Sequence, residues 1–337
     1  MKNIYVLPVL VIIIGLSAVN NFAYCQDSAK ERKYIFSLGT NFGFVHGLAF
    51  EYVYPIPNDT KGEFLSELRY DMKPVFFYGI HFDYKRGDLM GGPGFFASAS
   101  FKTGFAGDSG THENRDWISV ENNSLTYFSA HTNKTNELIW LDITLGTSFP
   151  VKQYFYIKPL FNVSWMHFSF TGRDGYGIYS RGKVFDASGN PIMFYSIDDN
   201  PIKRSYNGKE VIRYMQDWYM ITTGFIIGTN ILSPFSFDLS FQISPFTFCA
   251  ATDEHIERKI TFKDYTGWGL LLEPKGNISV NLENIIFSLE LTYRYIGRTR
   301  GISFYDNGNT GFYYQSANEA GAGLSLLNTC FLVRVFF

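Results

Sequence analysis

Asp253 and His255 have the side-chain types and the spacing needed for proton transfer. They end a segment that begins at Phe235, in which apolar and polar side chains alternate as far as Ser244. Such alternation is typical of a β-strand, where successive side chains point to opposite faces. If the strand continues past Pro245, the two residues share a face, and the carboxylate can orient the imidazole. The pattern predicts a general base at the end of a strand.

A second pair with the same spacing lies far away in the sequence. Asn114 and Asp116, within the segment Glu113–Trp117, are predicted to share a face at the outer end of another strand. A carboxylate there could hold a water molecule and stabilise developing charge. The amide of Asn114 can hydrogen-bond a water, but it carries no charge and cannot accept a proton. Ser129 and His131 invite a serine-hydrolase alternative, for which no third member or oxyanion loop is evident.

These residues are held by a chain whose alternation recurs almost throughout and predicts an antiparallel transmembrane β-barrel, an all-β fold of about ten strands. Asp142, Glu290 and Arg294 lie within such strands and are expected in a polar lumen, because a basic residue facing lipid near the midplane costs about 2–4 kcal/mol. Residues 171–208 are expected to form an outer loop. The predicted strands are 34–54, 63–83, 94–117, 127–149, 154–170, 212–232, 235–252, 262–280, 285–305 and 312–337.

Composition agrees with a membrane barrel that projects beyond the bilayer. Several predicted strands exceed the roughly 9–11 residues that a membrane requires. Aromatic residues make up 18% of the chain, a content expected of girdles at both interfaces. A soluble secreted β-sandwich or lipocalin-like barrel is the alternative, but its outer face would lack such dense Phe and Tyr. The net charge of −2 gives no support for a nucleic-acid partner.

Residues 1–25 are predicted to be a secretory signal peptide, and residues 26–337 a single barrel domain. The apolar run from Ile4 to Leu16 precedes Ala23 and Cys25, which are small residues at the two positions that a signal peptidase inspects. The run is shorter than the roughly 20 residues of a transmembrane helix. A lipoprotein anchored at Cys25 is the alternative. Cys249 and Cys330 then remain as two free thiols or one disulfide, with free thiols favoured.

The two chemical blocks resemble those of the omptins, a family of ten-stranded outer-membrane aspartyl endopeptidases of Gram-negative bacteria. Omptins carry an Asp-x-Asp-Trp block, similar to Glu113–Trp117, and an Asp-Glu-His block, similar to residues 253–255. The continuation Arg258–Phe262 is close to the family's basic-Ile-Thr-aromatic sequence. Further matches, which follow in the same order along the chain, are Ser37–Thr40, Glu51–Tyr54, Ser129–His131 and Ser169–Arg173.

The resemblance implies an aspartic-type endopeptidase whose active face is extracellular. Asp253 would orient His255, His255 would take a proton from water, and Asp116 would help to hold that water in a groove at the top of the barrel. No metal, cofactor or covalent intermediate is needed for this mechanism. Because Asn114 replaces the first Asp of the family's pair, a catalytically impaired barrel that binds proteins as an adhesin is the alternative. A small-molecule channel is a third hypothesis, disfavoured because about ten strands enclose an interior largely filled by side chains.

The resemblance also implies cleavage of peptides or proteins next to basic residues. Glu51 matches one of the acids that hold the basic side chain, whereas Ala251 stands where the family has a second. Trp140 is placed at or beside the acid that serves the next subsite. Ser129 and His131 are expected beside the groove as substrate-binding residues.

Outer-membrane lipids are the other partners that the resemblance implies, and the protein is expected to be a monomer. Arg173 matches one of the family's contacts with lipopolysaccharide. Asp217 stands where the family has another basic contact residue. Dependence on lipopolysaccharide is therefore supported at only one of these two positions.

Overall fold

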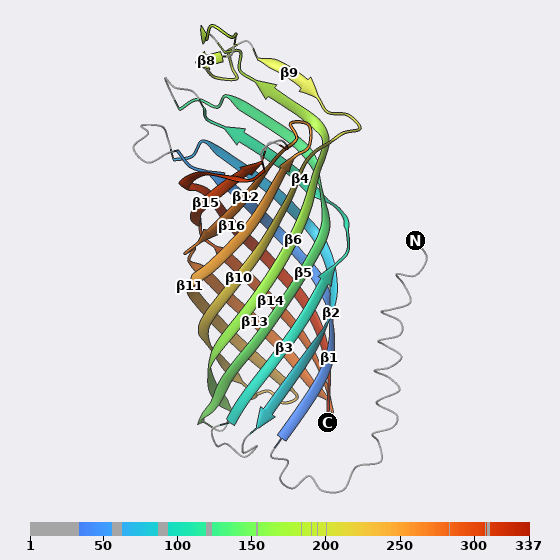
Figure 1. Ribbon diagram of the computed structural model, residues 1–337. Helices are drawn as coiled ribbons and strands as arrows, with labels where there is room; N and C mark the ends of the chain where they lie inside the picture. Colours follow the sequence, from blue (N-terminus) through green and yellow to red (C-terminus); the bar gives the residue numbers. More distant parts are fainter. Residues whose placement is uncertain are drawn as a thin grey trace.

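A computed structural model describes residues 34–55, 63–86, 94–118, 123–152, 154–182, 184–189, 191–193, 195–199, 201–282, 284–306, 308 and 311–337. The predicted signal peptide lies outside the described residues. Ten antiparallel arms close into a barrel through the pairing of the first and last arms (Figure 1), so the predicted fold class is confirmed. Each arm is one crossing of the barrel wall by the chain. Three arms are each divided into two strands, and three further short strands lie at the upper end. The strands are β1 (Tyr34–Val53), β2 (Ser66–Arg86), β3 (Gly94–Gly104), β4 (Gly107–Asp116), β5 (Tyr127–Lys152), β6 (Phe155–Tyr179), β7 (Val184–Phe185), β8 (Pro191–Met193), β9 (Ile202–Ser205), β10 (Glu210–Thr229), β11 (Phe235–His255), β12 (Ile260–Gly267), β13 (Leu271–Leu282), β14 (Ile285–Ile296), β15 (Arg300–Asp306) and β16 (Tyr313–Phe336).

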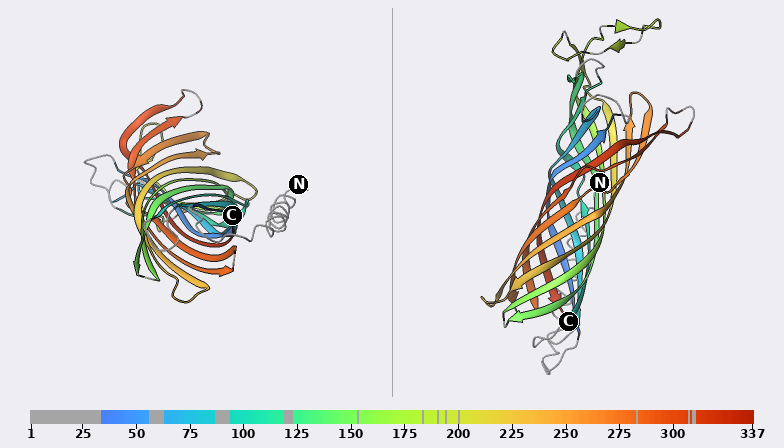
Figure 2. Two further views of the ribbon diagram at one scale, coloured as in Figure 1. Left: turned by 90° about the horizontal axis from the view of Figure 1, so that it is seen from below. Right: turned by 90° about the vertical axis from the view of Figure 1, so that its left-hand side faces the viewer.

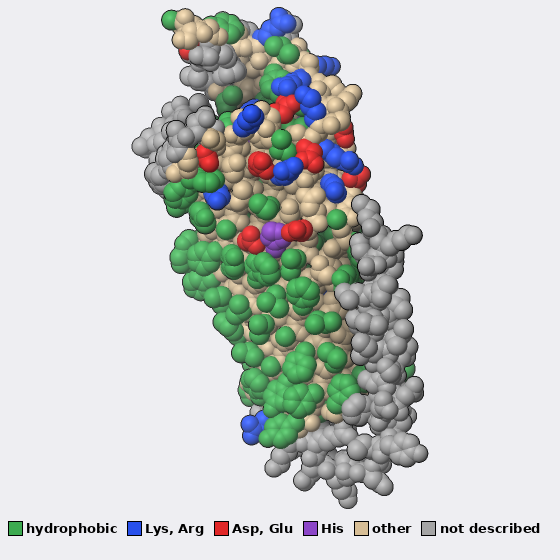
Figure 3. Space-filling model, turned by 45° about the vertical axis from the view of Figure 1, so that its right-hand side comes forward, with side chains coloured by type: hydrophobic (Ala, Val, Ile, Leu, Met, Phe, Trp, Pro, Cys, Tyr) green, Lys and Arg blue, Asp and Glu red, His purple; other side chains and the backbone are tan. Residues whose placement is uncertain are grey.

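The outer surface and the lumen divide the side chains as the alternation predicts. Figure 3 shows a broad hydrophobic band on the lower part of the barrel, with charged side chains gathered above it. In β11, Leu239 is 71% exposed, whereas Ser240 beside it is 9% exposed and faces inward. In the part of the chain that the structure describes, no helix has the length and apolar character needed to cross a membrane.

The upper end of the barrel is more ordered than its sequence indicates. The sequence predicts a loop over residues 171–208, but β6 continues through this region to Tyr179 and pairs there with β9. The other edge of this extension of β6 pairs with the outer end of β5, where Tyr127 lies opposite Tyr179. Above the membrane both faces of a strand meet water, so the apolar alternation that marks a lipid-facing strand is lost. Figure 2 shows this extension rising beyond the other strands.

The predicted continuation of β11 past Pro245 is confirmed, since this strand runs unbroken to His255. A proline has no N–H to donate to a neighbouring strand, and Pro245 lies where β11 changes partners. Below the proline β11 pairs with β13 as far as Ser244, and above it β11 pairs with β12 from Phe248. The ladder to β10 also shifts register at this level. The proline therefore marks the boundary between the lower barrel and the upper section that carries Asp253 and His255.

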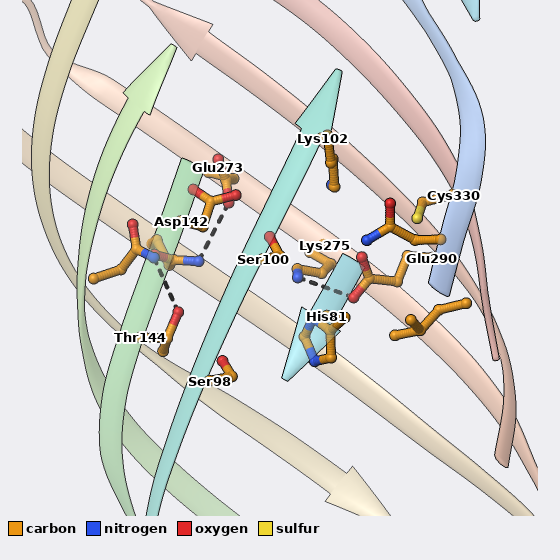
Figure 4. Close-up of a pocket in the computed structure, with 14 residues that line it drawn as sticks. His81, Ser98, Ser100, Lys102, Asp142, Thr144, Glu273, Lys275, Glu290 and Cys330 are labelled. Carbon is orange, nitrogen blue, oxygen red and sulfur yellow. Dashed lines mark hydrogen bonds and ion pairs between the residues drawn. The ribbon is translucent and has the colours of Figure 1, made fainter. Parts of the chain in front are cut away.

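An ion network fills the middle of the lumen. Arg294 is 3% exposed and donates from Nε to Glu273, while its Nη2 lies 3.6 Å from Asp142 Oδ1. Beside it, Lys275 Nζ lies 3.1 Å from Glu290 Oε2 (Figure 4). A cavity of about 60 Å³ lies beside Asp142, Glu273, Lys275 and Glu290, whereas a cavity of about 580 Å³ lies in the periplasmic half. The filled middle argues against the channel hypothesis.

Replacing Arg294 by leucine is expected to lower the free energy of unfolding by about 3–5 kcal/mol. The substitution would leave Glu273 and Asp142 as buried charges without their cation, and the loss of one partner from a buried ion pair is strongly destabilising. Denaturant titration of the barrel in lipid vesicles measures the change. The matched control is Arg213→Leu, because the half-exposed Arg213 pairs with Glu210 at the surface and such pairs contribute about 0–1 kcal/mol. Equal losses in the two variants would contradict this role of the network.

Candidate active site

The end of β11 positions an aspartate and a histidine in direct contact. His255 Nε2 lies 2.7 Å from Asp253 Oδ2, and the Asp253 side chain is only 3% exposed. The imidazole also packs edge-on against the ring of Phe262 on β12, with 5.7 Å between ring centroids. Because a strand places residues i and i+2 on one face, the local sequence is sufficient to create this pair. The carboxylate fixes the ring orientation and leaves Nδ1 as the nitrogen that can take a proton from water.

The second block lies on β4, at the same end of the barrel. Asn114 and Asp116 both face inward beside Ser66 of β2, whose hydroxyl donates to Asp116 Oδ1 at 2.7 Å and lies 3.2 Å from Asn114 Oδ1. Burial raises the pKa of Asp116 to about 6, although the Ser66 hydrogen bond and the positive charges of Arg258 and His255 oppose the shift. Ser66 was not predicted from sequence, since its place depends on the register between β2 and β4.

The two blocks are close enough for their charges to interact. Burial lowers the pKa of His255, but attraction by the Asp253 carboxylate outweighs this effect and Asp116 adds to it, so that the pKa is raised above its ordinary value. Arg258, in the turn after β11, repels the imidazolium. Together Asn114, Asp116, Asp253 and His255 form what we call the upper site. Its geometry suits a water molecule held by one wall and deprotonated by the other.

Ser129 and His131 lie in the wall behind Asn114. Ser129 is the cross-strand partner of Asn114 and is 1% exposed, while His131 is 2% exposed and its Nδ1 lies 2.6 Å from the carbonyl oxygen of Asp174. The ring of His131 stacks on that of His112 at 5.4 Å. The buried hydroxyl gives no support to the serine-hydrolase alternative. A role of these two residues in substrate binding stays a prediction.

Glu51 on β1 belongs to a group of acids that the sequence revealed only in part. It is 4% exposed, and its pKa is raised well above its ordinary value by burial and by repulsion from Asp253, Asp264 and Asp116. Asp264 on β12 was not predicted as a site residue. Burial raises its pKa to about 7, and Asp253 adds to the shift while a Ser303 hydrogen bond opposes it. Asp264 could be recognised only from its position opposite Ala251 on β12. That position depends on the pairing between β11 and β12.

The placement of Trp140 at a substrate subsite is wrong. Trp140 is 2% exposed and lies in the lumen, where its ring contacts the cationic groups of Arg294 at 4.4 Å and Lys102 at 4.5 Å. The residue that lies beside Asp116 is Tyr127, its cross-strand partner on β5. Tyr127 packs on Tyr179 with 4.6 Å between ring centroids. The wall next to Asp116 is therefore aromatic.

Arg173, which is predicted to contact lipid, lies on the upper part of the barrel, as does Asp217, which stands where the family has a basic residue. Arg173 is half-exposed, and its Nη2 lies 3.0 Å from Asp108 Oδ1. Asp217 accepts hydrogen bonds from Trp165 and His167, and His167 also contacts Glu137. Lipid binding at Arg173 stays a prediction. The two predicted thiols, Cys249 and Cys330, are free and buried, so the disulfide alternative is wrong for this structure.

Comparison with known proteins decides the family. The sequence profile of the omptin family matches residues 32–333 of this chain. The chain belongs to the omptin family. Its fold is similar to the crystal structure of the outer membrane protease OmpT from Escherichia coli, with a TM-score of 0.77 and 18% identity over 92% of this chain and 99% of that one. The omptin barrel lies in the bacterial outer membrane with its active face outside.

Two further barrels are much less similar to this omptin. The translocator domain of the autotransporter NalP from Neisseria meningitidis has a TM-score of 0.33 and 8% identity over 96% of this chain and 95% of that one. The toluene transporter TbuX from Ralstonia pickettii has a TM-score of 0.28 and 10% identity over 91% and 90%. No curated protein matches the sequence significantly.

Proposed function

We propose that this omptin is an endopeptidase that hydrolyses peptide bonds next to basic residues at the cell surface. The contact of 2.7 Å between His255 and Asp253, with Asp116 close enough to influence the imidazole, is the observation that carries the proposal. His255 takes a proton from the attacking water, and Asp253 stabilises the imidazolium that forms. Asp116 and Asn114 hold the water against the scissile carbonyl carbon.

The proton balance of the reaction needs only these side chains. The water oxygen bonds to the carbonyl carbon as its proton passes to His255. The imidazolium then returns a proton to the leaving amine as the C–N bond breaks, which restores the neutral base. Asn114 can direct the water through its amide, whereas only Asp116 supplies negative charge on that wall.

A digest of a peptide library tests the proposal. The refolded full chain is expected to cut peptides that contain Arg or Lys, with fragments identified by mass spectrometry. The rate should rise between about pH 5 and about pH 8, because His255 must be neutral to accept a proton and Asp116 must be ionised. Both are deprotonated forms, which higher pH favours, and the raised pKa values of the two groups move the rise in rate toward neutral pH. A rate that falls over this range would contradict the assigned roles.

The second candidate function is that of a surface binding protein with impaired catalysis. Asn114 favours it, because the neutral amide lies in the wall where the family has a carboxylate. This function predicts that the wild-type chain retains peptides without cutting them. The same library distinguishes the two candidates when retention on immobilised protein is measured beside cleavage.

A further inference from the structure

Ala251 and Asp264 are direct cross-strand partners on β11 and β12. Both are 6% exposed, and both face the barrel interior. Opposite residues of an antiparallel pair have Cβ atoms only about 4.5–5.5 Å apart. The carboxylate of Asp264 therefore lies next to the place that a carboxylate at position 251 would take, where Ala251 presents only a methyl group.

Among the described residues, the charges that act on Glu51 and Asp264 include no cation. The charges that act most strongly on Glu51 are those of Asp253, Asp264 and Asp116, all of the same sign. Among the described residues, Glu51 Oε2 and Asp264 Oδ1 are buried and accept no hydrogen bond. Two buried carboxylates that face each other without a cation are costly. The arrangement is complementary to a positively charged group that comes from outside.

We propose that Asp264, together with Glu51, binds the basic side chain next to the scissile bond and so replaces the acid that is missing at position 251. This inference rests on the proposed function and names its specificity-determining residue. Asp253 connects the two roles, because it contacts His255 at 2.7 Å and also repels Asp264. A side chain held by Asp264 and Glu51 consequently places its own peptide bond beside the general base.

The chemistry favours a guanidinium or an ammonium group over a metal ion. In the described part of the chain, no group of three or more His, Cys, Asp or Glu side chains is arranged to hold a metal. The planar guanidinium of arginine can donate two parallel hydrogen bonds to a carboxylate and is desolvated more easily than an ammonium. Arginine is therefore the expected preference over lysine.

The preference for a basic residue should also increase with pH. The groups that interact with Asp264 are Glu51 on β1, Tyr214 on β10, Cys249 and Asp253 on β11, and Ser303 on β15. The pKa of Asp264 is about 7, so the carboxylate gains its charge as the pH rises through neutrality. Loss of the His255 proton over the same range acts in the same direction.

The test compares two quenched fluorescent peptides that differ only in one residue, arginine or its neutral isostere citrulline. The ratio of their kcat/KM values measures recognition of charge independently of catalysis. Asp264→Ala is expected to lower this ratio at least about tenfold. Adding Ala251→Asp to this variant should restore the ratio, because a carboxylate returns next to that place from the opposite strand.

Glu254→Ala is the matched control. Glu254 lies next to Asp253, but its side chain points outward and is 44% exposed near Arg213, so the ratio should not change. An unchanged ratio in Asp264→Ala overturns the proposal. The ratio is also unchanged when both peptides lose turnover equally, and that result indicates a structural role of Asp264.

Failure of the proposed function is distinguishable from failure of this inference. If the wild type cuts neither peptide, fluorescence anisotropy of labelled peptides measures binding alone. Tighter binding of the arginine peptide that is lost in Asp264→Ala supports the inference even without catalysis. Equal binding of both peptides by the wild type overturns it.

Discussion

Replacing His255 by alanine is expected to lower kcat by about 10²–10⁴-fold, the usual contribution of a general base. The loss follows from the proposed function, in which His255, which lies 2.7 Å from Asp253, deprotonates the water. Initial rates on an arginine-containing peptide measure the effect. KM should change little, because the side chain that binds the substrate's cation is not His255.

Glu254→Ala serves as the control for this substitution as well, since it removes a side chain from the outward face of the same strand. Asp253→Asn should resemble His255→Ala, because the amide cannot stabilise an imidazolium. Activity that survives His255→Ala within about tenfold would show that the water is activated by another group. The barrel would then share only the scaffold of the family.

Replacing Asn114 by aspartate is expected to raise the rate about five- to tenfold. A hydrogen bond to a charged group is stronger than a neutral one by roughly 1–1.5 kcal/mol, which corresponds to about five- to tenfold in rate. The new carboxylate would also raise the pKa of Asp116 above its present value of about 6 by repulsion, so the acidic limb of the pH–rate profile should move to higher pH. The measurement is kcat/KM as a function of pH.

Asn114→Leu provides the matched neutral variant, because it keeps the approximate volume of Asn114 and removes its polar atoms. The expected order of rates is Leu, then Asn, then Asp. An inert wild type that gains activity in Asn114→Asp would show that the natural protein is the impaired barrel. Equal rates in all three variants would mean that position 114 does not touch the water.

The arms of the barrel could be predicted because lipid and lumen select opposite side chains along each strand. In β11 the two faces differ from Leu239 to Ser240, and the period of two carries that signal up to Asp253 and His255. The signal ends where both faces meet water, which is why the extension of β6 to Tyr179 was missed. A strand there differs from a loop only in its hydrogen bonds.

Residues that depend on the pairing of distant strands could not be predicted from one sequence. Ser66 reaches Asp116, and Asp264 lies opposite Ala251, only because of particular registers, and a shift of one residue would turn either side chain to the other face. The error at Trp140 has another origin, which is its height along the strand. Its place along β5 puts it in the lumen, whereas Tyr127 of that strand lies beside Asp116.

The charged side chains in the barrel's middle bear on where the fragments of a substrate would go under the proposed function. Arg294 and its partners stand between the upper site and the periplasmic cavity, so both halves of a cut peptide would leave toward the medium. Hydrolysis by this protein would therefore feed no nutrient directly to the cell, and any uptake would need a separate transporter. The same obstruction lets the outer membrane carry many copies without losing its permeability barrier.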